Sequence, residues 1–302
     1  MTPEKFETLL DRIGVKWEKR EVPKNNSVVL TGYMIGEKRI RPTIYEDMIR
    51  SHNEVELIKL IEEVINGIDN TDSVFTVDNV RLKVYPAVRS KKWNKYDEDT
   101  VTVPTDGFDD LETYFYIKLE QSDMRALGIV NTDEDGTSSV QIHKGLMNEL
   151  GLSIEELKKY ANINMHKEFT LKSMTQVFNE MLIEEGYPFN AKEEDEEPLM
   201  DEILYVASNI GKVKGAGILA SKECMKDIKE FAKKKKWGSY AILPSSVHEV
   251  LIAKVSGIEE KERMDTMVEE VNETIDDKQI ILEDHSYIFI YDEDDDDYIP
   301  LS

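Results

Sequence analysis

Residues 239–255 read SYAILPSSVHEVLIAKV and contain two runs of strand-forming residues, 239–243 and 249–255. Pro244-Ser245-Ser246 lies between the two runs, and residues of these types are typical of a turn. The stretch therefore predicts two neighbouring strands joined by a short turn.

Related patterns extend in both directions from this pair of strands. Runs rich in apolar residues predict further strands at residues 27–35, 39–45, 80–84, 114–119, 203–207, 216–220, 280–282 and 287–291. Asp135-Gly136, between residues 128–130 and 140–142, indicates a hairpin turn. Apolar residues at helical spacing predict helices that begin after Thr2, Asn53, Ser153, Ser173 and Ser221, and a further helix through residues 264–271. The first of these helices is expected to stop at Gly14.

This mixture of helices and short hairpins favours an α+β fold with mostly antiparallel sheets over a regular doubly wound sheet. Residues 193–198 are five adjacent anions followed by a Pro, which resist packing and predict a linker. We expect an N-terminal portion at 1–190, the acidic linker at 191–201, a smaller C-terminal portion at 202–291 and an acidic tail at 292–302.

The composition excludes several classes of protein. The 302 residues include 62 Asp and Glu against 38 Lys and Arg, which gives a formal net charge of -24. Because nucleic-acid binding relies on Lys and Arg to neutralise phosphates, no direct binding of DNA or RNA is expected. No apolar run is long enough to predict a membrane span, and the N-terminus lacks a signal-peptide pattern. The single cysteine, Cys224, forbids an internal disulfide, so a reducing, cytoplasmic location is expected.

One short segment brings together residue types that can catalyse hydrolysis. Ser245, Ser246, His248 and Glu249 supply two hydroxyls, an imidazole and a carboxylate. A Ser–His–acid catalyst needs these groups to face one another, whereas neighbours on a strand point to opposite faces. A turn whose hydroxyls bond to the local backbone is the favoured interpretation, and a hydrolase-like enzyme is the alternative.

Other motifs give weaker signals. Residues 131–136 resemble the start of a calcium loop, but Ile142 stands where a bidentate Glu is needed. Gly215 and Gly217 lack the phosphate-loop pattern and indicate close packing of the backbone instead. Cys224, in the first turn of a predicted helix, is expected to be a buried, inert thiol. No two histidines have a ligand spacing on a helix, so neither a metal nor a cofactor is predicted. The histidines are His52, His143, His166, His248 and His285.

The C-terminal residues combine charge with apolar groups. Six consecutive anions are followed by Tyr298-Ile299-Pro300-Leu301. Such a segment can dock on a basic protein partner that has an apolar pocket, although acidic runs are often only solubilising. The residues expected to bind the partner are Asp292, Glu293, Asp294, Asp295, Asp296, Asp297 and Tyr298.

Several stretches resemble a known family. Residues 24–30 and 42–45 resemble the N-terminal hallmarks of the clostridial domain-of-unknown-function family 5688. The similarity resumes at residues 243–250, which read LPSSVHEV, and continues through Val268, Val271, Asn272, Leu282, Asp284 and Tyr287. Residues 85–90 and 146–164 resemble, more weakly, a second family, number 1444. Both resemblances imply a bacterial or phage cytoplasmic protein, and neither supplies an activity, a substrate or a cofactor.

The leading hypothesis is a non-enzymatic acidic module that binds a basic protein partner. One specific form is a phage or mobile-element inhibitor that mimics nucleic acid and occupies a nucleic-acid-binding groove. The competing hypothesis is the hydrolase-like enzyme, and a third is a subunit of a larger assembly, with the oligomeric state left open.

Overall fold

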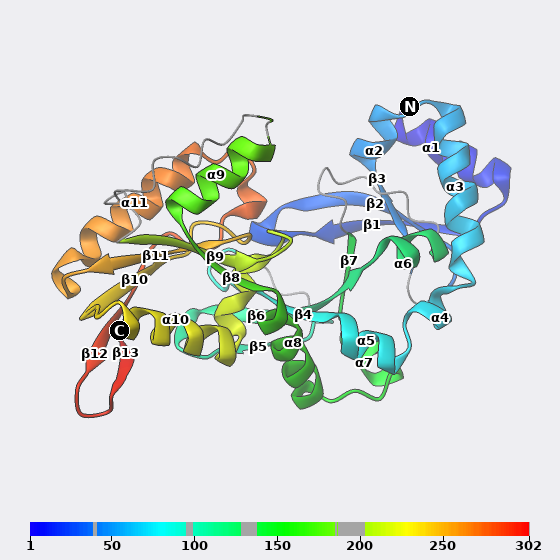
Figure 1. Ribbon diagram of the computed structural model, residues 1–302. Helices are drawn as coiled ribbons and strands as arrows, with labels where there is room; N and C mark the ends of the chain where they lie inside the picture. Colours follow the sequence, from blue (N-terminus) through cyan, green and yellow to red (C-terminus); the bar gives the residue numbers. More distant parts are fainter. Residues whose placement is uncertain (39–40, 95–98, 128–137, 185, 187–202, 302) are drawn as a thin grey trace. The chain divides into compact units, whose positions relative to one another are not determined.

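A computed structural model of the chain describes residues 1–38, 41–94, 99–127, 138–184, 186 and 203–301 (Figure 1). It confirms an α+β fold with mostly antiparallel sheets. The chain divides into two compact units: unit 1 comprises residues 1–84, 95–100 and 116–154, and unit 2 comprises residues 85–94, 101–115 and 155–302. In the described part of the chain, no helix is both long enough and apolar enough to cross a membrane.

Unit 1 contains a three-stranded antiparallel sheet in the order β1-β2-β3. The strands of the sheet are β1 (Trp17–Pro23), β2 (Val29–Ile35) and β3 (Thr43–Tyr45), with a 3₁₀ turn at Asn25–Ser27. Unit 1 also contains strand β7 (Ser138–Gln141), which lies outside this sheet. Its helices are α1 (Pro3–Ile13), α2 (Glu46–Ser51), α3 (Glu54–Ile68), α4 (Thr71–Val74), α5 (Val77–Lys83), α6 (Gln121–Ala126) and α7 (Lys144–Glu149).

The longer helices of unit 1 begin and end where the sequence predicts. The Thr2 side chain caps α1, and Gly14 ends it with a φ of 77°, which a glycine adopts without strain. Asn53 and Glu56 form a reciprocal capping box at the start of α3. Apolar residues of both helices then pack with β2 in one buried core, which stabilises the unit.

Unit 2 is built on a six-stranded antiparallel sheet in the order β13-β12-β10-β11-β9-β8. Its strands are β8 (Phe169–Ser173), β9 (Leu204–Asn209), β10 (Ser239–Leu243), β11 (Val250–Val255), β12 (Tyr287–Asp292) and β13 (Asp297–Leu301). The α-helices are α8 (Ile154–Glu168), α9 (Met174–Glu184), α10 (Lys222–Lys234) and α11 (Lys261–Thr274), and 3₁₀ helices lie at Gly215–Ala220, Ile258–Glu260 and Lys278–Ile280.

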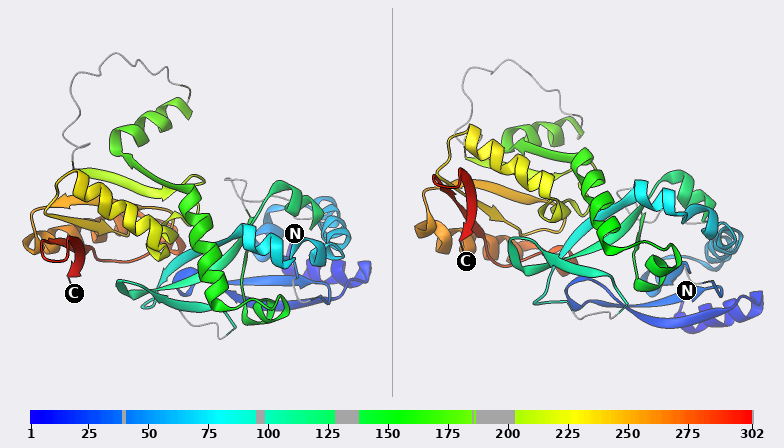
Figure 2. Two further views of the ribbon diagram at one scale, coloured as in Figure 1. Left: turned by 60° about the horizontal axis from the view of Figure 1, so that its bottom comes forward. Right: turned by 90° about the horizontal axis from the view of Figure 1, so that it is seen from below.

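Two helices cover opposite faces of this sheet (Figures 1 and 2). Met264 and Val268 of α11 pack with Ala241 and Leu243 of β10 in a buried cluster. On the other face, Phe231 of α10 meets the Tyr205 ring of β9 edge to face at 4.6 Å. Since helices cover both faces of the sheet, side chains on both sides of the central strand β10 are buried.

A third sheet has the strand order β4-β6-β5, and β7 also pairs with β6. The strands are β4 (Val84–Ser90), β5 (Thr102–Thr105) and β6 (Phe108–Leu119). At the start of β6, the Phe108 ring packs on Tyr287 and Phe289 of β12 at centroid distances of 4.8 Å and 6.0 Å. This contact brings the residues after Phe108 close to the start of β12.

Two predicted strands are wrong because local capping favours helical turns. Residues 80–83 belong to α5, since Thr76 accepts a hydrogen bond from the Asn79 amide and caps a helix, and β4 begins only at Val84. At residues 280–282, Ile280 ends a 3₁₀ helix capped by Asp277, and Ile281 forms an isolated bridge.

A third predicted strand, at residues 216–220, is also wrong. This segment forms a 3₁₀ helix at Gly215–Ala220, which packs tightly on neighbouring backbone. A Cβ added to Gly217 would lie 2.1 Å from the carbonyl oxygen of Pro86, and one added to Gly215 would lie 2.3 Å from that of His248. Close approach therefore explains both glycines, as the sequence predicts. Strands β1, β5, β8 and β13 have no counterpart among the predicted strands.

The predicted boundaries of the portions stay a prediction. The acidic linker at 191–201 and the turn at Asp135-Gly136 lie outside the described residues. Strands β8 and β9, which flank the linker in the chain, pair in one sheet. Within the predicted tail at 292–302, residues 297–301 form β13, an edge strand of that sheet.

Candidate functional site

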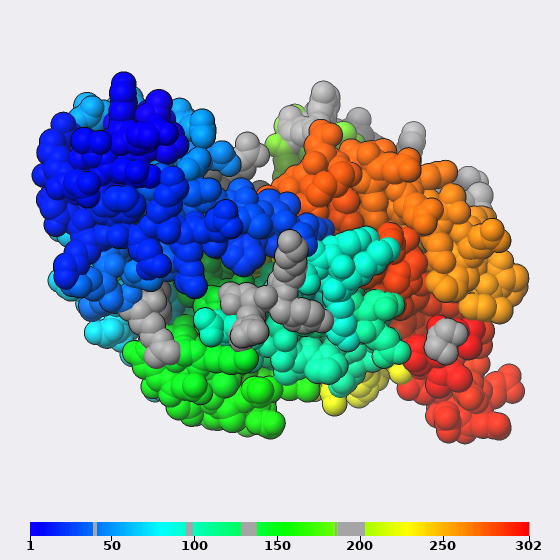
Figure 3. All heavy atoms as spheres, turned by 180° about the vertical axis from the view of Figure 1, so that it is seen from behind, coloured from blue at the N-terminus to red at the C-terminus, as the bar shows by residue number. Residues whose placement is uncertain are grey.

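The first candidate surface is the acidic loop, residues 292–297, which joins β12 to β13. These strands pair from Ile288 with Leu301 up to Asp292 with Asp297, so the six anions lie at the tip of a hairpin. An amide of Asp294 donates to the Asp292 carboxylate at 2.9 Å, and Asp296 adopts a φ of 53°. Figure 3 shows the end of the chain, in red, standing out from unit 2.

Helix α10 neutralises part of the acidic loop. Lys233 pairs with Asp296 at 2.5 Å, and Lys229 pairs with Asp297 at 2.7 Å. The hydrogen bond from Lys233 lowers the pKa of Asp296 below its usual value. Burial acts to raise the pKa of Asp297, but the bonds from Lys229 and from the Tyr298 amide outweigh it and lower that pKa. Among the described residues, no cation pairs with Asp292, Glu293, Asp294 or Asp295.

Tyr298 anchors the hairpin from the inside. Its side chain is 1% exposed, and its ring packs against Tyr240 and Tyr291 at centroid distances of 5.0 Å and 5.3 Å. Its hydroxyl donates to the carbonyl oxygen of Trp237. The ring is therefore part of the protein's own core, and the surface that a partner can reach includes the carboxylates and the exposed Ile299 and Pro300.

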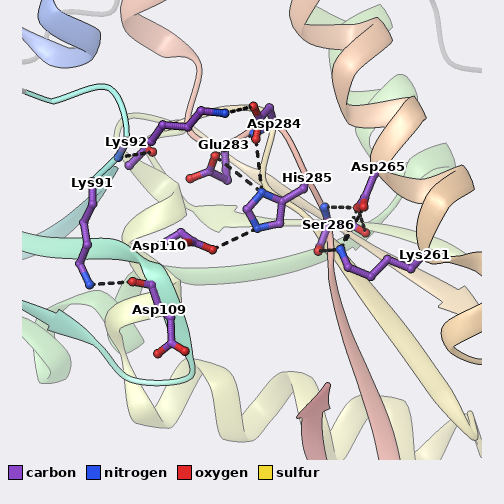
Figure 4. Close-up of polar contacts among 11 residues, drawn as sticks. Lys91, Lys92, Asp109, Asp110, Lys261, Asp265, Glu283, Asp284, His285 and Ser286 are labelled. Atoms are coloured by element: carbon purple, nitrogen blue, oxygen red, sulfur yellow. Dashed lines mark hydrogen bonds and ion pairs between the residues drawn. The ribbon is translucent and has the colours of Figure 1, made fainter. Parts of the chain in front are cut away.

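The second candidate is the His285 cluster, formed by Asp110, Glu283, Asp284 and His285 (Figure 4). Nδ1 of His285 lies 3.3 Å from Oδ1 of Asp284 and 3.7 Å from Oε1 of Glu283. Nε2 of the same ring lies 3.4 Å from Oδ2 of Asp110. One imidazole thus faces three carboxylates, with both ring nitrogens directed at oxygen atoms.

The carboxylates of the His285 cluster have different surroundings. Asp284 accepts a 2.6 Å bond from Lys92, and although burial acts to raise its pKa, this bond and others nearby lower it. Glu283 is 1% exposed, and burial raises its pKa in spite of the neighbouring Ser90 hydroxyl and the Asp284 amide. Within the described part of the chain, Oε2 of Glu283 has no hydrogen-bond partner.

Helix α11 holds the backbone of the segment that carries this cluster. The Asp265 carboxylate accepts bonds from the amide and the hydroxyl of Ser286 at 2.7 Å and 2.6 Å, and Lys261 donates to the Ser286 carbonyl at 2.9 Å (Figure 4). Asn272 donates to the Glu283 carbonyl at 2.9 Å. These bonds fix residues 283–286 on both sides of His285.

The segment that contains Ser245, Ser246, His248 and Glu249 lies beside the His285 cluster, and its backbone bonds to residues 282 and 283. The Pro244 carbonyl accepts the Glu283 amide at 2.9 Å, and the Ser245 carbonyl accepts the Leu282 amide at 3.3 Å. The Ser246 hydroxyl accepts the His248 amide at 3.0 Å, which is the local turn contact that the sequence predicts.

His248 is engaged through a backbone contact. Its Nδ1 accepts a bond from the Lys214 amide at 3.2 Å, and its carbonyl accepts one from the Ser208 hydroxyl at 2.7 Å. Glu249 lines a small cavity of about 80 Å³ together with Lys172 and Lys212. The catalytic roles of Ser245, Ser246, His248 and Glu249 remain a prediction.

Cys224 is buried in the first turn of α10. Its amide bonds to the Ser221 hydroxyl, which caps the helix. Burial raises the pKa of the thiol to about 12 and outweighs the hydrogen bond with Ser221, which lowers it, so this sulfur is a poor nucleophile at neutral pH.

Sequence reasoning identified the acidic loop but missed the His285 cluster. Asp110 comes from β6 and Lys92 from the turn that follows β4, and Lys92 is 192 positions from Asp284 in the chain. A local signal did exist: Glu283, Asp284 and His285 are three consecutive residues of metal-ligating types, directly before a predicted strand.

Comparison with known proteins gives one match. The model of a family described as "Family of unknown function (DUF5688)" matches residues 3–291, nearly the whole chain. No curated protein and no solved structure matches the chain.

Proposed function

Since the chain belongs to the family of unknown function DUF5688, whose description names no activity, we propose from its own residues that it is a non-enzymatic, acidic protein-binding module. The observation that carries this proposal is the acidic loop, in which Asp292, Glu293, Asp294 and Asp295 have no cationic partner among the described residues. The partner is a protein with a basic surface, because four unneutralised carboxylates on one loop attract Lys and Arg.

The hairpin presents these charges on a fixed support. Tyr298 is buried at its base, and the pairs with Lys229 and Lys233 tie the C-terminal side of the loop to α10. A support that is already ordered loses little conformational freedom on binding, which favours affinity. The net charge of -24 adds a long-range field that speeds the encounter with a cationic surface.

A narrower form of the proposal is an inhibitor that mimics nucleic acid, as the sequence suggests for a phage or mobile-element protein. Its carboxylates would occupy the positions of phosphates in the partner's nucleic-acid-binding groove. In this form, duplex DNA competes with the chain for the same partner.

The test compares two variants that remove the same number of charges. The hairpin variant is Asp292→Asn, Glu293→Gln, Asp294→Asn and Asp295→Asn. The control variant is Glu262→Gln, Glu269→Gln, Glu270→Gln and Glu273→Gln, all on exposed positions of α11. Each tagged full-length chain captures proteins from the host lysate at low and moderate salt, and the captured proteins are quantified by mass spectrometry.

We expect a basic protein that is captured by the wild type and by the control variant, is lost with the hairpin variant, and is released as salt increases. Equal capture by the hairpin variant and the wild type would contradict the proposal. The purified partner is then tested with duplex DNA, and release of the chain by DNA supports the mimicry form, whereas a ternary complex argues against it.

A further inference from the structure

The His285 cluster has an arrangement of acceptors that needs a positive charge at its centre. Oδ2 of Asp110 lies 3.4 Å from Nε2 of His285 and is placed to accept a hydrogen bond from that nitrogen. If Nε2 donates this bond to Asp110, a neutral ring has a lone pair on Nδ1, which faces Oδ1 of Asp284 at 3.3 Å and Oε1 of Glu283 at 3.7 Å. A lone pair that faces two carboxylates is repulsive, so Nδ1 in this arrangement carries either a proton or a metal ion.

We propose that Glu283, Asp284 and His285 form a binding site for a divalent transition metal ion of the zinc type, a property that goes beyond the proposed protein-binding function. The ligand atoms are Nδ1 of His285, Oδ1 of Asp284 and a carboxylate oxygen of Glu283. These donor atoms all lie within 4.8 Å of one another in the described structure. Donors bonded at ~2.1 Å to a tetrahedral zinc ion lie about 3.4 Å apart, so the ligands need only small movements to close on the ion.

An independent observation is the unsatisfied oxygen of Glu283. Its Oε2 is buried and, among the described residues, has no hydrogen-bond partner. A buried acceptor without a partner costs free energy, and strain, a catalytic role, an ordered water or a bound ion accounts for such a group in native proteins. Oε1 of the same carboxylate accepts the Asp284 amide at 3.1 Å, so a metal ion would supply the missing partner by binding Oε2.

The groups around the ligands also suit a metal site. A histidine that binds a metal ion donates its other ring N–H to a carboxylate or carbonyl, and Asp110 occupies that position. Lys92 binds Oδ2 of Asp284 and leaves Oδ1 directed toward His285. Asn272 donates to the Glu283 carbonyl and Asp265 accepts the Ser286 amide, so the backbone on either side of the ligands is held before an ion binds.

The donor set selects the class of ion. One imidazole nitrogen and two carboxylates suit zinc, cobalt and related ions, whereas calcium takes six to eight oxygen ligands. Three protein ligands leave one position for water, and the site is open to solvent, since the side chains of His285 and Asp284 are 29% and 34% exposed.

The test uses Co²⁺ and Zn²⁺ with the full-length chain after treatment with a chelator. Co²⁺ binding is followed by visible absorption, and Zn²⁺ is measured by competition against bound Co²⁺. We expect one equivalent of Co²⁺ with absorption bands of a four-coordinate ion, and at least a 100-fold loss of affinity for His285→Ala. The Asp110→Asn variant should bind roughly 10-fold more weakly and shift the Co²⁺ bands, because it changes the hydrogen bond to the ligating ring.

Two controls keep the result interpretable. Glu283→Gln has the same shape as the native residue and removes one ligand charge, so it reports on binding even where His285→Ala disturbs the fold, which circular dichroism monitors. His166→Ala removes another histidine that pairs with an aspartate, Asp227, at 2.9 Å, and it should leave binding unchanged. Absence of stoichiometric binding would overturn the proposal, as would binding that survives both His285→Ala and Glu283→Gln.

Discussion

The acidic loop and the His285 cluster flank the same strand, β12, and differ in how they handle negative charge. The loop follows β12 and places six carboxylates at the molecular surface. The cluster precedes β12 and places carboxylates around one imidazole, with Glu283 fully buried. The negative charge of the loop is therefore screened by solvent and partly neutralised by Lys229 and Lys233. The negative charge of the cluster is instead offset by a few neighbouring side chains, such as Lys92.

The number of like charges is therefore a poor guide to a ligand site. Exposed carboxylates repel one another weakly because water and salt screen them, so a run of six needs no bound cation. A single buried carboxylate with an unpaired oxygen is far costlier, since no water compensates the lost hydrogen bond. The loop thus suits reversible contact with a charged partner surface, and the cluster suits a bound ion.

The largest expected effect separates the support of the loop from its charge. Tyr298→Ala removes a buried ring from the contacts with Tyr240 and Tyr291 and should lower the free energy of unfolding by about 3–5 kcal/mol. Denaturation by urea measures the change. Tyr298→Phe keeps the ring and loses only the bond to Trp237, so its effect should be about 1 kcal/mol. Equal losses in the two variants would show that the hydroxyl, and not the ring, holds the hairpin.

A smaller effect is expected where α11 holds the cluster segment. Asp265 accepts two bonds from Ser286 and contacts Lys261, and these bonds outweigh burial and lower its pKa. Asp265→Asn should cost about 1–3 kcal/mol at neutral pH, because it weakens charge-assisted bonds.

The Asp265 effect should depend on pH in a defined direction. A carboxyl with a lowered folded-state pKa adds stability above its unfolded pKa of about 3.9 and loses it as the pH falls through the folded value. The difference between wild type and Asp265→Asn should therefore be constant near neutral pH and shrink below about pH 4. Urea denaturation at a series of pH values provides the measurement. A difference that persists unchanged at low pH would mean that the ionised carboxylate is not the stabilising form.

Local signals in the sequence predicted much of the fold. Helix starts at Thr2, Asn53, Ser173 and Ser221 are correct because a cap satisfies amides of the next turn, which depends on adjacent residues alone. The prediction of strands β10 and β11 is correct because each strand has its own apolar pattern, which is also a local signal. Capping in the structure also explains the error at residues 80–83, where Thr76 overrides a short alternating pattern.

The His285 cluster could not be predicted in the same way. Recognition of the cluster as a site depends on the burial of Glu283 and on the position of Asp110 beside His285. Both follow from packing between segments that are distant in the sequence. Packing of Phe108 on Tyr287 brings Asp110 to the ring, and no local pattern encodes that contact. The acidic loop was visible in the sequence because charge alone defines it, but the burial of Tyr298 was not.

The smallest expected effect concerns the pair between Lys233 and Asp296, which is exposed to solvent. Lys233→Met should leave the melting temperature unchanged within error at physiological salt, because exposed ion pairs contribute little. The same change removes the hydrogen bond that lowers the pKa of Asp296, so this pKa should rise toward that of an ordinary aspartate. Carbon-detected NMR of the side-chain carboxyl during a pH titration measures the shift. An unchanged pKa would mean that Tyr291, whose hydroxyl also bonds to Asp296, sets the titration, and that α10 does not moderate the charge of the acidic loop.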